Sequence, residues 1–362
     1  MKRPMKRYLV NILVIIFVFI FIIQNSISVA FAQDNISSII TTSPIFVNLE
    51  TKPSSQISTV LEVQNNSSKA ITIKVKLEEF KANGNSGQAQ IYNPPINTPS
   101  LSWVHFSKST FTALPNVWNS ITMTINLPKT ASLGYYYAVL FSPQYSSNVS
   151  SSARIKGANA ILVLLDAKTA NNKYSLAIKS FTSIKTIYQY LPASFRVDVA
   201  NNGNIFTSPQ GDVYISKTIN GPSIATIPFN SSGGNILPNS DRVFNVQWTS
   251  GFPVYQLKRY HNQILTNSNG IPQTSLHWNF KNVSEFRIGK YYAHLVLVYN
   301  NGIRDISAQS WVGFWVLPWI MILIIIIILA ILALGIWTLF KPFIKRALMP
   351  AKLRSKRIKR RS

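Results

Sequence analysis

Side chains able to do chemistry are few in this sequence and widely spaced. The adjacent carboxylates Glu78 and Glu79 fall in an alternating strand pattern, where neighbours point to opposite faces and cannot form a working pair. The histidines show no HExxH spacing, and the chain has no cysteine to complete a metal site. They are His105, His261, His277 and His294. Nucleophile-elbow, Walker and dinucleotide-binding motifs are absent too, so the sequence predicts a protein that is not an enzyme and has no cofactor.

The candidates for partner binding lie in the segment from Phe252 to Phe280. This segment combines aromatic and basic side chains, the types that dominate interface hot spots and stack on sugars. The candidate residues are Tyr255, Lys258, Arg259, Tyr260, His261, His277 and Trp278. Two other interpretations stay open: a long hairpin whose aromatic side chains fold back on the domain, and a metal or hydrolase site around His261 and His277.

The chain between residues 33 and 315 has the pattern of β-strands. Apolar and polar residues alternate over residues 71–77, 121–127, 195–199 and 244–248, which predicts strands with one buried and one exposed face. Residues 160–165 are continuously apolar, as in a strand covered on both faces. Clusters of Asn, Gly, Pro and Ser separate these runs, and no sustained helical period occurs. About 280 residues of this kind predict two β-sandwiches.

An internal repeat supports two domains, because three local signatures recur in the same order. The pairs are Val63–Asn66 with Val199–Asn202, Leu114–Asn116 with Leu237–Asn239, and Gly134–Ala138 with Gly289–Ala293. We interpret the tyrosines of the last pair as structural, with one ring in the core and another bonded to a neighbouring loop. The prediction is an all-β fold of two tandem immunoglobulin-like β-sandwiches, residues 33–170 and 171–313, the second with an insert at residues 252–280.

Two hydrophobic runs bracket these domains. The first, from Leu9 to Ile23, follows four basic residues and leads to the sequence Ala30-Phe31-Ala32, which predicts a signal peptide at residues 1–32. The second is uncharged from Val316 to Phe340. As a helix it would extend for about 37 Å, enough to cross a hydrocarbon core of roughly 30 Å. We therefore predict a single C-terminal transmembrane helix at residues 314–340.

Charge predicts the orientation of the chain. Residues 341–362 contain ten basic residues and no acidic one, which predicts a basic cytoplasmic tail and an N-terminus outside the cell membrane. Of the 36 Lys and Arg, four precede the first run and ten follow the second, so 22 face the 11 acidic residues, a net charge of +11 outside. This charge favours anionic partners such as wall polymers. Nucleic acid is disfavoured, because the densest basic stretch lies at the inner membrane face.

Several stretches of the first domain match a known family. They are Ser43–Val47, Leu61–Ser68, Ile71–Phe80, Gly87–Gln88, Trp103, Leu114–Pro115, Ile125–Pro128 and Leu133–Tyr135. Over most of residues 43–142 the chain resembles the WxL-interacting surface proteins of Gram-positive bacteria, and its order of signal, two domains, membrane helix and basic tail agrees. The resemblance implies a first domain that binds peptidoglycan and a second that engages a protein partner. It assigns no ligand-contacting residue.

These observations predict a membrane-anchored extracellular binding protein. Its β-sandwiches would attach to cell-wall polymer (peptidoglycan), to a secreted or surface protein, or to both. An alternative is a chaperone-like assembly factor that pairs an edge strand with other exported surface proteins. This alternative predicts a long unpaired strand at the edge of one domain.

Overall fold

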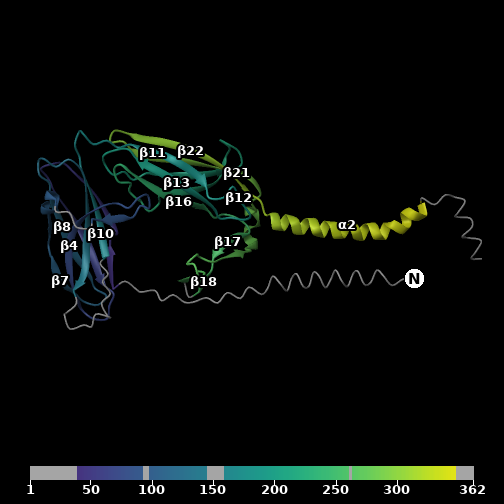
Figure 1. The fold of residues 1–362 in the computed structure, drawn as a ribbon, viewed down its shortest axis with the longest axis horizontal. Helices are drawn as coiled ribbons and strands as arrows, with labels where there is room; N and C mark the ends of the chain where they lie inside the picture. The colour runs from purple at the N-terminus through teal and green to yellow at the C-terminus, as the bar shows by residue number, and fades with distance from the viewer. Residues whose placement is uncertain (1–38, 93–97, 145–158, 261–262, 348–362) are drawn as a thin grey trace, which may run out of the picture. The chain divides into compact units, whose positions relative to one another are not determined.

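The computed structural model describes residues 39–92, 98–144, 159–260 and 263–347 (Figure 1). The predicted signal peptide, His261 and residues 348–362 of the predicted tail lie outside the described residues. Among the described residues, those from 39 to 254 and from 277 to 347 form one compact unit, whereas residues 255–276 belong to a second.

Residues 40–167 form a sandwich of two sheets (Figure 1). One sheet has the strand order β1-β3-β8-β6, and the other has the order β2-β10-β9-β4-β5, with β7 also paired to β4. Their bounds are β1 Ile40–Ser43, β2 Phe46–Thr51, β3 Gln56–Asn65, β4 Ile71–Ala82, β5 Ala89–Ile91, β6 Val104–Phe106, β7 Thr110–Ala113, β8 Trp118–Asn126, β9 Leu133–Gln144 and β10 Asn159–Ala167, with a 3-10 helix, η1, at Pro99–Trp103. Neighbouring strands are antiparallel except β2 and β10, which are parallel.

The predicted alternation is confirmed in this core. In β4, Ile73 and Val75 are buried while Lys74 is exposed, and β8 buries Ile121 and Met123 in the same way. The strand predicted to be covered on both faces is part of β10, where residues 163–165 are all buried. Residues 163 and 165 face the core, and residue 164 faces a second apolar cluster outside the sandwich.

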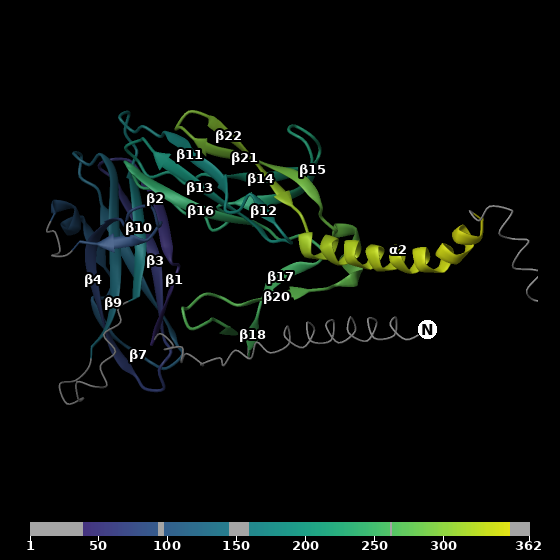
Figure 2. The same cartoon turned by 45° about the vertical axis from the view of Figure 1, so that its right-hand side comes forward.

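Residues 176–316 form the second sandwich, whose strands Figure 2 labels. One sheet has the order β11-β13-β16 and the other the order β12-β22-β21-β14-β15. The bounds are β11 Leu176–Ser183, β12 Ile187–Tyr188, β13 Ala193–Asn201, β14 Gln210–Ser216, β15 Ser223–Phe229, β16 Ser240–Trp248, β21 Gly289–Asn300 and β22 Asp305–Val316. The core packs aromatic rings edge to face: Trp248 lies 5.1 Å from Tyr291, and Phe195 lies 5.1 Å from Phe314, centroid to centroid.

The first repeated signature has the same structure in both sandwiches. Asn65 ends β3 and Asn201 ends β13, and both are almost completely buried. The side-chain amide of Asn65 donates to the carbonyls of Lys69 and Ala113, at 2.8 and 3.0 Å. That of Asn201 donates to the carbonyls of Ile205 and Ile236, at 2.8 and 2.9 Å. Each asparagine therefore closes its own turn and fastens it to a second segment of the same domain.

The tyrosine signature shows a shift of one residue. Tyr137 and Tyr291 both point into their cores, and their hydroxyls donate to the carbonyls of Ser100 and Ile288, at 3.3 and 3.4 Å. Tyr137 lies three residues after Gly134, whereas Tyr291 lies two residues after Gly289, the glycine that the repeat aligns with Gly134. Because side chains alternate along a strand, this shift puts the ring of Tyr136 on the outer face of the first sandwich.

The insert at residues 252–280 contains two small sheets. One pairs β17 (Val254–Leu257) with β20 (Thr274–His277), and the other pairs β18 (Arg259–Tyr260) with β19 (Gln263–Ile264). A 3-10 helix, η3, follows at Phe280–Glu285 and leads towards β21. The hairpin prediction for this segment agrees with these pairings.

The C-terminal helix, α2, spans Trp319–Ala347. Its segment Trp319–Thr338 has a mean hydropathy of 3.3 and is long and apolar enough to cross a membrane. The helix begins five residues after the predicted start at 314, because Phe314 and Val316 are buried residues of β22. The described part of the chain is thus mostly β-sheet: two immunoglobulin-like sandwiches, with the apolar helix α2 after them.

Candidate functional site

The predicted binding residues of the insert do not form one described site. Tyr255 is half-buried on β17, while Lys258, Arg259 and Tyr260 are exposed. These four belong to the compact unit of residues 255–276, and His261 lies outside the described residues.

The last two predicted binding residues belong to the other compact unit. His277 is exposed at the end of β20. The ring of Trp278 packs edge-on against Phe252 at 5.6 Å and lies parallel to Phe280. Nowhere in the described part of the chain do three His, Asp or Glu side chains gather as a metal site.

A hollow that the sequence did not predict lies between the two sandwiches. It is a cleft of about 370 Å³, formed by the β4–β5 turn, the start of β2, strand β10 and the segment that leads into β16. Most of its lining is apolar, with Ile45, Phe46, Phe80, Leu162, Leu164 and Leu237. Clefts of this size with few polar groups are the usual shape of a binding site.

The polar group that distinguishes this cleft is the guanidinium of Arg242. Its Nη1 donates to the carbonyl of Asn235 at 2.8 Å, and its Cζ lies 5.1 Å from the ring centroid of Phe244. The neighbouring carboxylate, Asp241, is 2.5 Å from Lys179 instead. In the described part of the chain no carboxylate forms an ion pair with Arg242, and burial lowers the pKa of this arginine.

Two glycines make room for this side chain. A Cβ on Gly87, in the β4–β5 turn, would lie 2.5 Å from Nε of Arg242. A Cβ on Gly234 would lie 2.6 Å from its Cζ. These glycines come from different sandwiches, so the guanidinium is held where the two domains meet.

Polar contacts join the walls of the cleft. The side chains of Asn48 and Asn235 exchange hydrogen bonds of 2.8 and 3.4 Å. The backbone N–H of Val243 donates to the carbonyl of Asn85 at 2.9 Å. The β4–β5 turn of the first sandwich is therefore attached to strand β16 of the second.

An apolar cluster packs beside the cleft. Phe80, Ala138 and Leu164 from the first sandwich contact Ile205 and Phe206 from the second, and all five are buried. The ring of Tyr136 lies edge-on between Phe80 and Phe206, at 6.1 and 6.3 Å. Burial raises the pKa of the Tyr136 hydroxyl, and this environment keeps it protonated.

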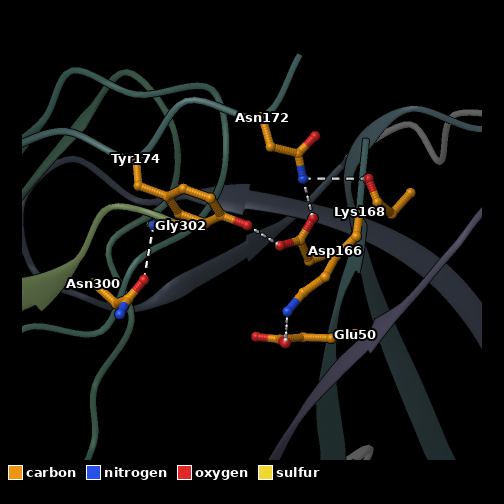
Figure 3. A network of polar contacts seen from close by, with 8 residues as sticks. Glu50, Asp166, Lys168, Asn172, Tyr174, Asn300 and Gly302 are labelled. Atoms are coloured by element: carbon orange, nitrogen blue, oxygen red, sulfur yellow. Dashed lines mark hydrogen bonds and ion pairs between the residues drawn. The ribbon is translucent and has the colours of Figure 1, made fainter. Parts of the chain in front are cut away.

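A polar network lies at the junction of the two domains (Figure 3). The carboxylate of Asp166, at the end of β10, accepts hydrogen bonds from the Tyr174 hydroxyl at 2.5 Å and the Asn172 amide at 2.6 Å. Asp166 is only 1% exposed, and its burial raises the pKa of this carboxyl. Beside it, Lys168 and Glu50 form an ion pair of 2.5 Å. The network fastens the linker to the first sandwich and leads directly into β11.

Strand β16 is the edge of its sheet, since it pairs only with β13. In an antiparallel ladder alternate residues point their N–H and C=O groups outward, and Val243, bonded to Asn85, is one of these. Asn245 and Gln247 face the same way, and their N–H groups have no hydrogen-bond partner in the described part of the chain. A stretch of open edge therefore begins next to the cleft.

A second hollow, of about 470 Å³, lies on the first sandwich. Its carboxylate is Glu79, which accepts hydrogen bonds from the hydroxyls of Thr98 and Ser100 at 2.6 and 2.5 Å. Aromatic residues including Trp103 and Tyr135, which pack edge-on at 5.0 Å, line the same hollow. Glu78 points to the other face of β4 and pairs with Lys76, so the two carboxylates are separated as predicted.

The sequence matches no protein-family model and no curated protein. Among solved structures the chain is similar to the class 5 fimbriae chaperone CfaA, with 15% identity over 75% of this chain and 98% of that one, at a TM-score of 0.36. The E. coli chaperone DraB is 8% identical over 76% and 96% of the two chains, with a TM-score of 0.32. The Pseudomonas aeruginosa chaperone CupB2 is 7% identical over 75% and 99%, with a TM-score of 0.30. These identities and TM-scores are too low to carry a function to this chain.

Proposed function

We propose that this chain is a membrane-anchored extracellular binding protein that holds an extended segment of a protein partner in the cleft between its sandwiches. The observation that carries this proposal is Arg242, a half-buried cation with no carboxylate partner in the described part of the chain, set in an apolar wall. The protein would act by binding, without catalysis or cofactor.

Burying a guanidinium costs free energy unless an anion compensates it. Arg242 has one carbonyl acceptor, and the rest of its planar donor set can bind a carboxylate through two parallel hydrogen bonds. The apolar lining around it suits aliphatic side chains. The chemistry therefore favours a partner segment with apolar residues next to a carboxylate, which is either that of its C-terminus or that of an acidic side chain.

Strand β16 offers the backbone part of such a site. An extended partner segment that enters the cleft can pair with the outward groups of Asn245 and Gln247. Binding through backbone groups tolerates many partner sequences, which is what an assembly factor for exported surface proteins requires. A stable receptor and a chaperone-like assembly factor would use the same surface and differ in how long the partner stays bound.

Helix α2 would be the anchor. We propose that it crosses the cell membrane once, with both sandwiches outside and the basic tail in the cytoplasm. Its apolar length and the basic residues after Phe340 support this orientation. The resemblance to WxL-interacting proteins agrees with the same placement.

The test uses the full-length protein in lipid nanodiscs and a short fluorescent peptide of alternating Val and Thr with a free C-terminal carboxylate. Fluorescence anisotropy measures its Kd, and the same peptide with an amidated C-terminus is the control. We expect the carboxylate peptide to bind more tightly, and Arg242→Gln to weaken its binding by roughly 10- to 100-fold.

The matched control variant is Arg304→Gln, an exposed arginine in the turn between β21 and β22. It should leave the Kd unchanged. Equal binding of the carboxylate and amide peptides, or equal effects of the two arginine variants, would contradict the proposal.

A second candidate function is binding of cell-wall polymer at the hollow around Glu79. Aromatic rings beside a carboxylate suit sugar rings, which stack on aromatics and hydrogen-bond to acidic groups. The full-length protein in nanodiscs should be retained by purified peptidoglycan, and Trp103→Ala should reduce this retention more than Trp118→Ala, an exposed tryptophan on β8. No retention of the unmodified protein at physiological salt would exclude this candidate.

A further inference from the structure

Strand β22 leads into helix α2 through only two residues. Leu317 and Pro318 separate Val316, the last residue of the strand, from Trp319, the first of the helix. The N–H of Leu317 donates to the carbonyl of Tyr188 at 2.7 Å, so this link is fastened to the second sandwich. Two extended residues reach about 7 Å. If α2 crosses the bilayer, the end of the sandwich next to Val316 must lie at the lipid surface.

Helix η3 belongs to this end of the sandwich. It is followed, after three residues, by β21, whose first residue Gly289 lies opposite Val316 in the ladder. The bridge between Phe252 and Phe286 and the hydrogen bond from Phe252 N–H to the Glu285 carbonyl hold η3 in place.

Large apolar side chains are exposed there. Phe280 is 73% exposed, and the parallel ring of Trp278, at 6.4 Å, is 45% exposed. Val283 in η3 and Ile288 before β21 are exposed as well. Aromatic rings favour the headgroup layer of a bilayer, which borders hydrocarbon on one side and water on the other.

The charge of this end is positive. Between residues 278 and 290 the basic residues Lys281, Arg287 and Lys290 outnumber one acid, Glu285. Lys217 adds a fourth cation, since its Nζ donates to the carbonyl of Ile288 at 2.7 Å. Basic side chains beside exposed aromatics fit an anionic lipid surface.

We infer that the end of the second sandwich formed by η3 and the start of β21 is a lipid-contacting surface, which rests on the anionic headgroups of the bilayer that α2 crosses. This inference depends on the proposed anchoring role of α2. It adds a second attachment, which limits the tilt of the sandwiches over the membrane. Phe280 and Trp278 enter the headgroup layer, and Lys281 and Lys290 bind its phosphates.

The absence of cysteine from the sequence makes a direct test possible. A nitroxide label on Ser284→Cys, an exposed position in η3, reports the depth of this surface when the full-length protein is in nanodiscs of phosphatidylcholine and phosphatidylglycerol. Accessibility to oxygen and to a water-soluble nickel complex is measured by electron paramagnetic resonance. The matched control is Ile303→Cys, which is 91% exposed in the β21–β22 turn at the other end of this hairpin.

We expect the label at 284 to be protected from nickel and accessible to oxygen, while the label at 303 is fully accessible to nickel. Phe280→Ser or Lys281→Glu with Lys290→Glu should shift the label at 284 towards water, and so should discs of phosphatidylcholine alone. A third label, on Leu329→Cys in α2, separates the two hypotheses. If it reports the bilayer interior while 284 is as wet as 303, the lipid-contacting surface is wrong and the anchor stands. If 329 is itself exposed to nickel, both are wrong.

Discussion

At the scale of single residues, the two sandwiches have a buried asparagine in common. The recurrence of Asn65 and Asn201 is visible in the sequence because both end an alternating strand in an Asn-rich turn. It could not show that each amide reaches a carbonyl far along the sequence, Ala113 in one case and Ile236 in the other. Spacing along a sequence reports local turns, whereas these partners are set by how the sheets pack.

Replacing Asn201 by Ala should destabilise the second sandwich strongly. It removes two donors from the buried carbonyls of Ile205 and Ile236 and one acceptor from the N–H of Gly203. Losing these three buried hydrogen bonds should lower the free energy of unfolding by about 2–5 kcal/mol. Urea unfolding of the full-length protein in nanodiscs, followed by tryptophan fluorescence, measures the change.

The matched control is Asn300→Ala. Asn300 is exposed at the end of β21, where water replaces its bonds to Gly302 and Asp305. It should cost less than about 1 kcal/mol. Similar losses in the two variants would refute a structural role of burial at Asn201.

Asp166 should make the stability of this protein depend on pH in a recognisable way. Burial raises its pKa in the folded state above the unfolded value, so the folded state binds this proton first. The ionised carboxylate therefore opposes folding above the folded pKa, and this cost disappears as pH falls through that pKa towards the unfolded value. Asp166→Asn keeps an acceptor for Tyr174 and removes the charge.

The stability of Asp166→Asn relative to the unmodified protein should therefore rise between acidic and neutral pH. Unfolding curves of both proteins at a series of pH values measure this difference, and the common effect of other carboxylates cancels. A difference that is flat with pH would show that the charge of Asp166 carries no such cost.

At the scale of elements, strands were predictable from the sequence where one of their faces is exposed to solvent. The alternation in β4, β8, β13 and β16 identifies these strands directly, because nearly all of their exposed positions are polar. Pairing was not predictable: β1 and β2 follow each other in sequence but join opposite sheets. The start of α2 was misplaced for a related reason, since the buried end of β22 is as apolar as the helix that follows.

Two proline substitutions in β16 should distinguish an effect on partner binding from an effect on folding. Asn245→Pro removes an outward N–H, as edge strands tolerate, and should weaken peptide binding with little loss of stability. Val246→Pro removes an inward N–H bonded within the ladder to β13, and should cost about 1–3 kcal/mol more. Anisotropy and urea unfolding on both variants test this. Unchanged peptide binding by a folded Asn245→Pro variant would remove β16 from the proposed site.

At the scale of the whole molecule, the cleft depends on contacts between residues far apart in the sequence. Gly87 and Gly234 read as ordinary turn residues, and nothing in their neighbourhood marks them as the walls around Arg242. The insert was predicted to bind a partner because aromatic and basic residues are dense there. Composition identifies segments rich in side chains that favour binding. A cleft, in contrast, arises from the shapes of two domains and has no local signature in the sequence.

The variant Gly234→Ala tests whether these long-range contacts position Arg242 for binding. Its φ lies outside the left-handed region, so Gly234→Ala adds a methyl group without backbone strain, and that methyl would lie 2.6 Å from Cζ of Arg242. The guanidinium must move, which breaks its bond to Asn235 and misplaces its free donors. We expect the carboxylate peptide to bind about tenfold more weakly, because a charged hydrogen bond contributes about 1.5–3 kcal/mol.

In a protein that already carries Arg242→Gln, Gly234→Ala should have almost no further effect, since the two changes remove the same contact. Gly335→Ala, whose methyl meets open space on α2, should leave the Kd unchanged in both backgrounds. Additive losses would mean that Gly234 acts on binding by some route other than the position of Arg242.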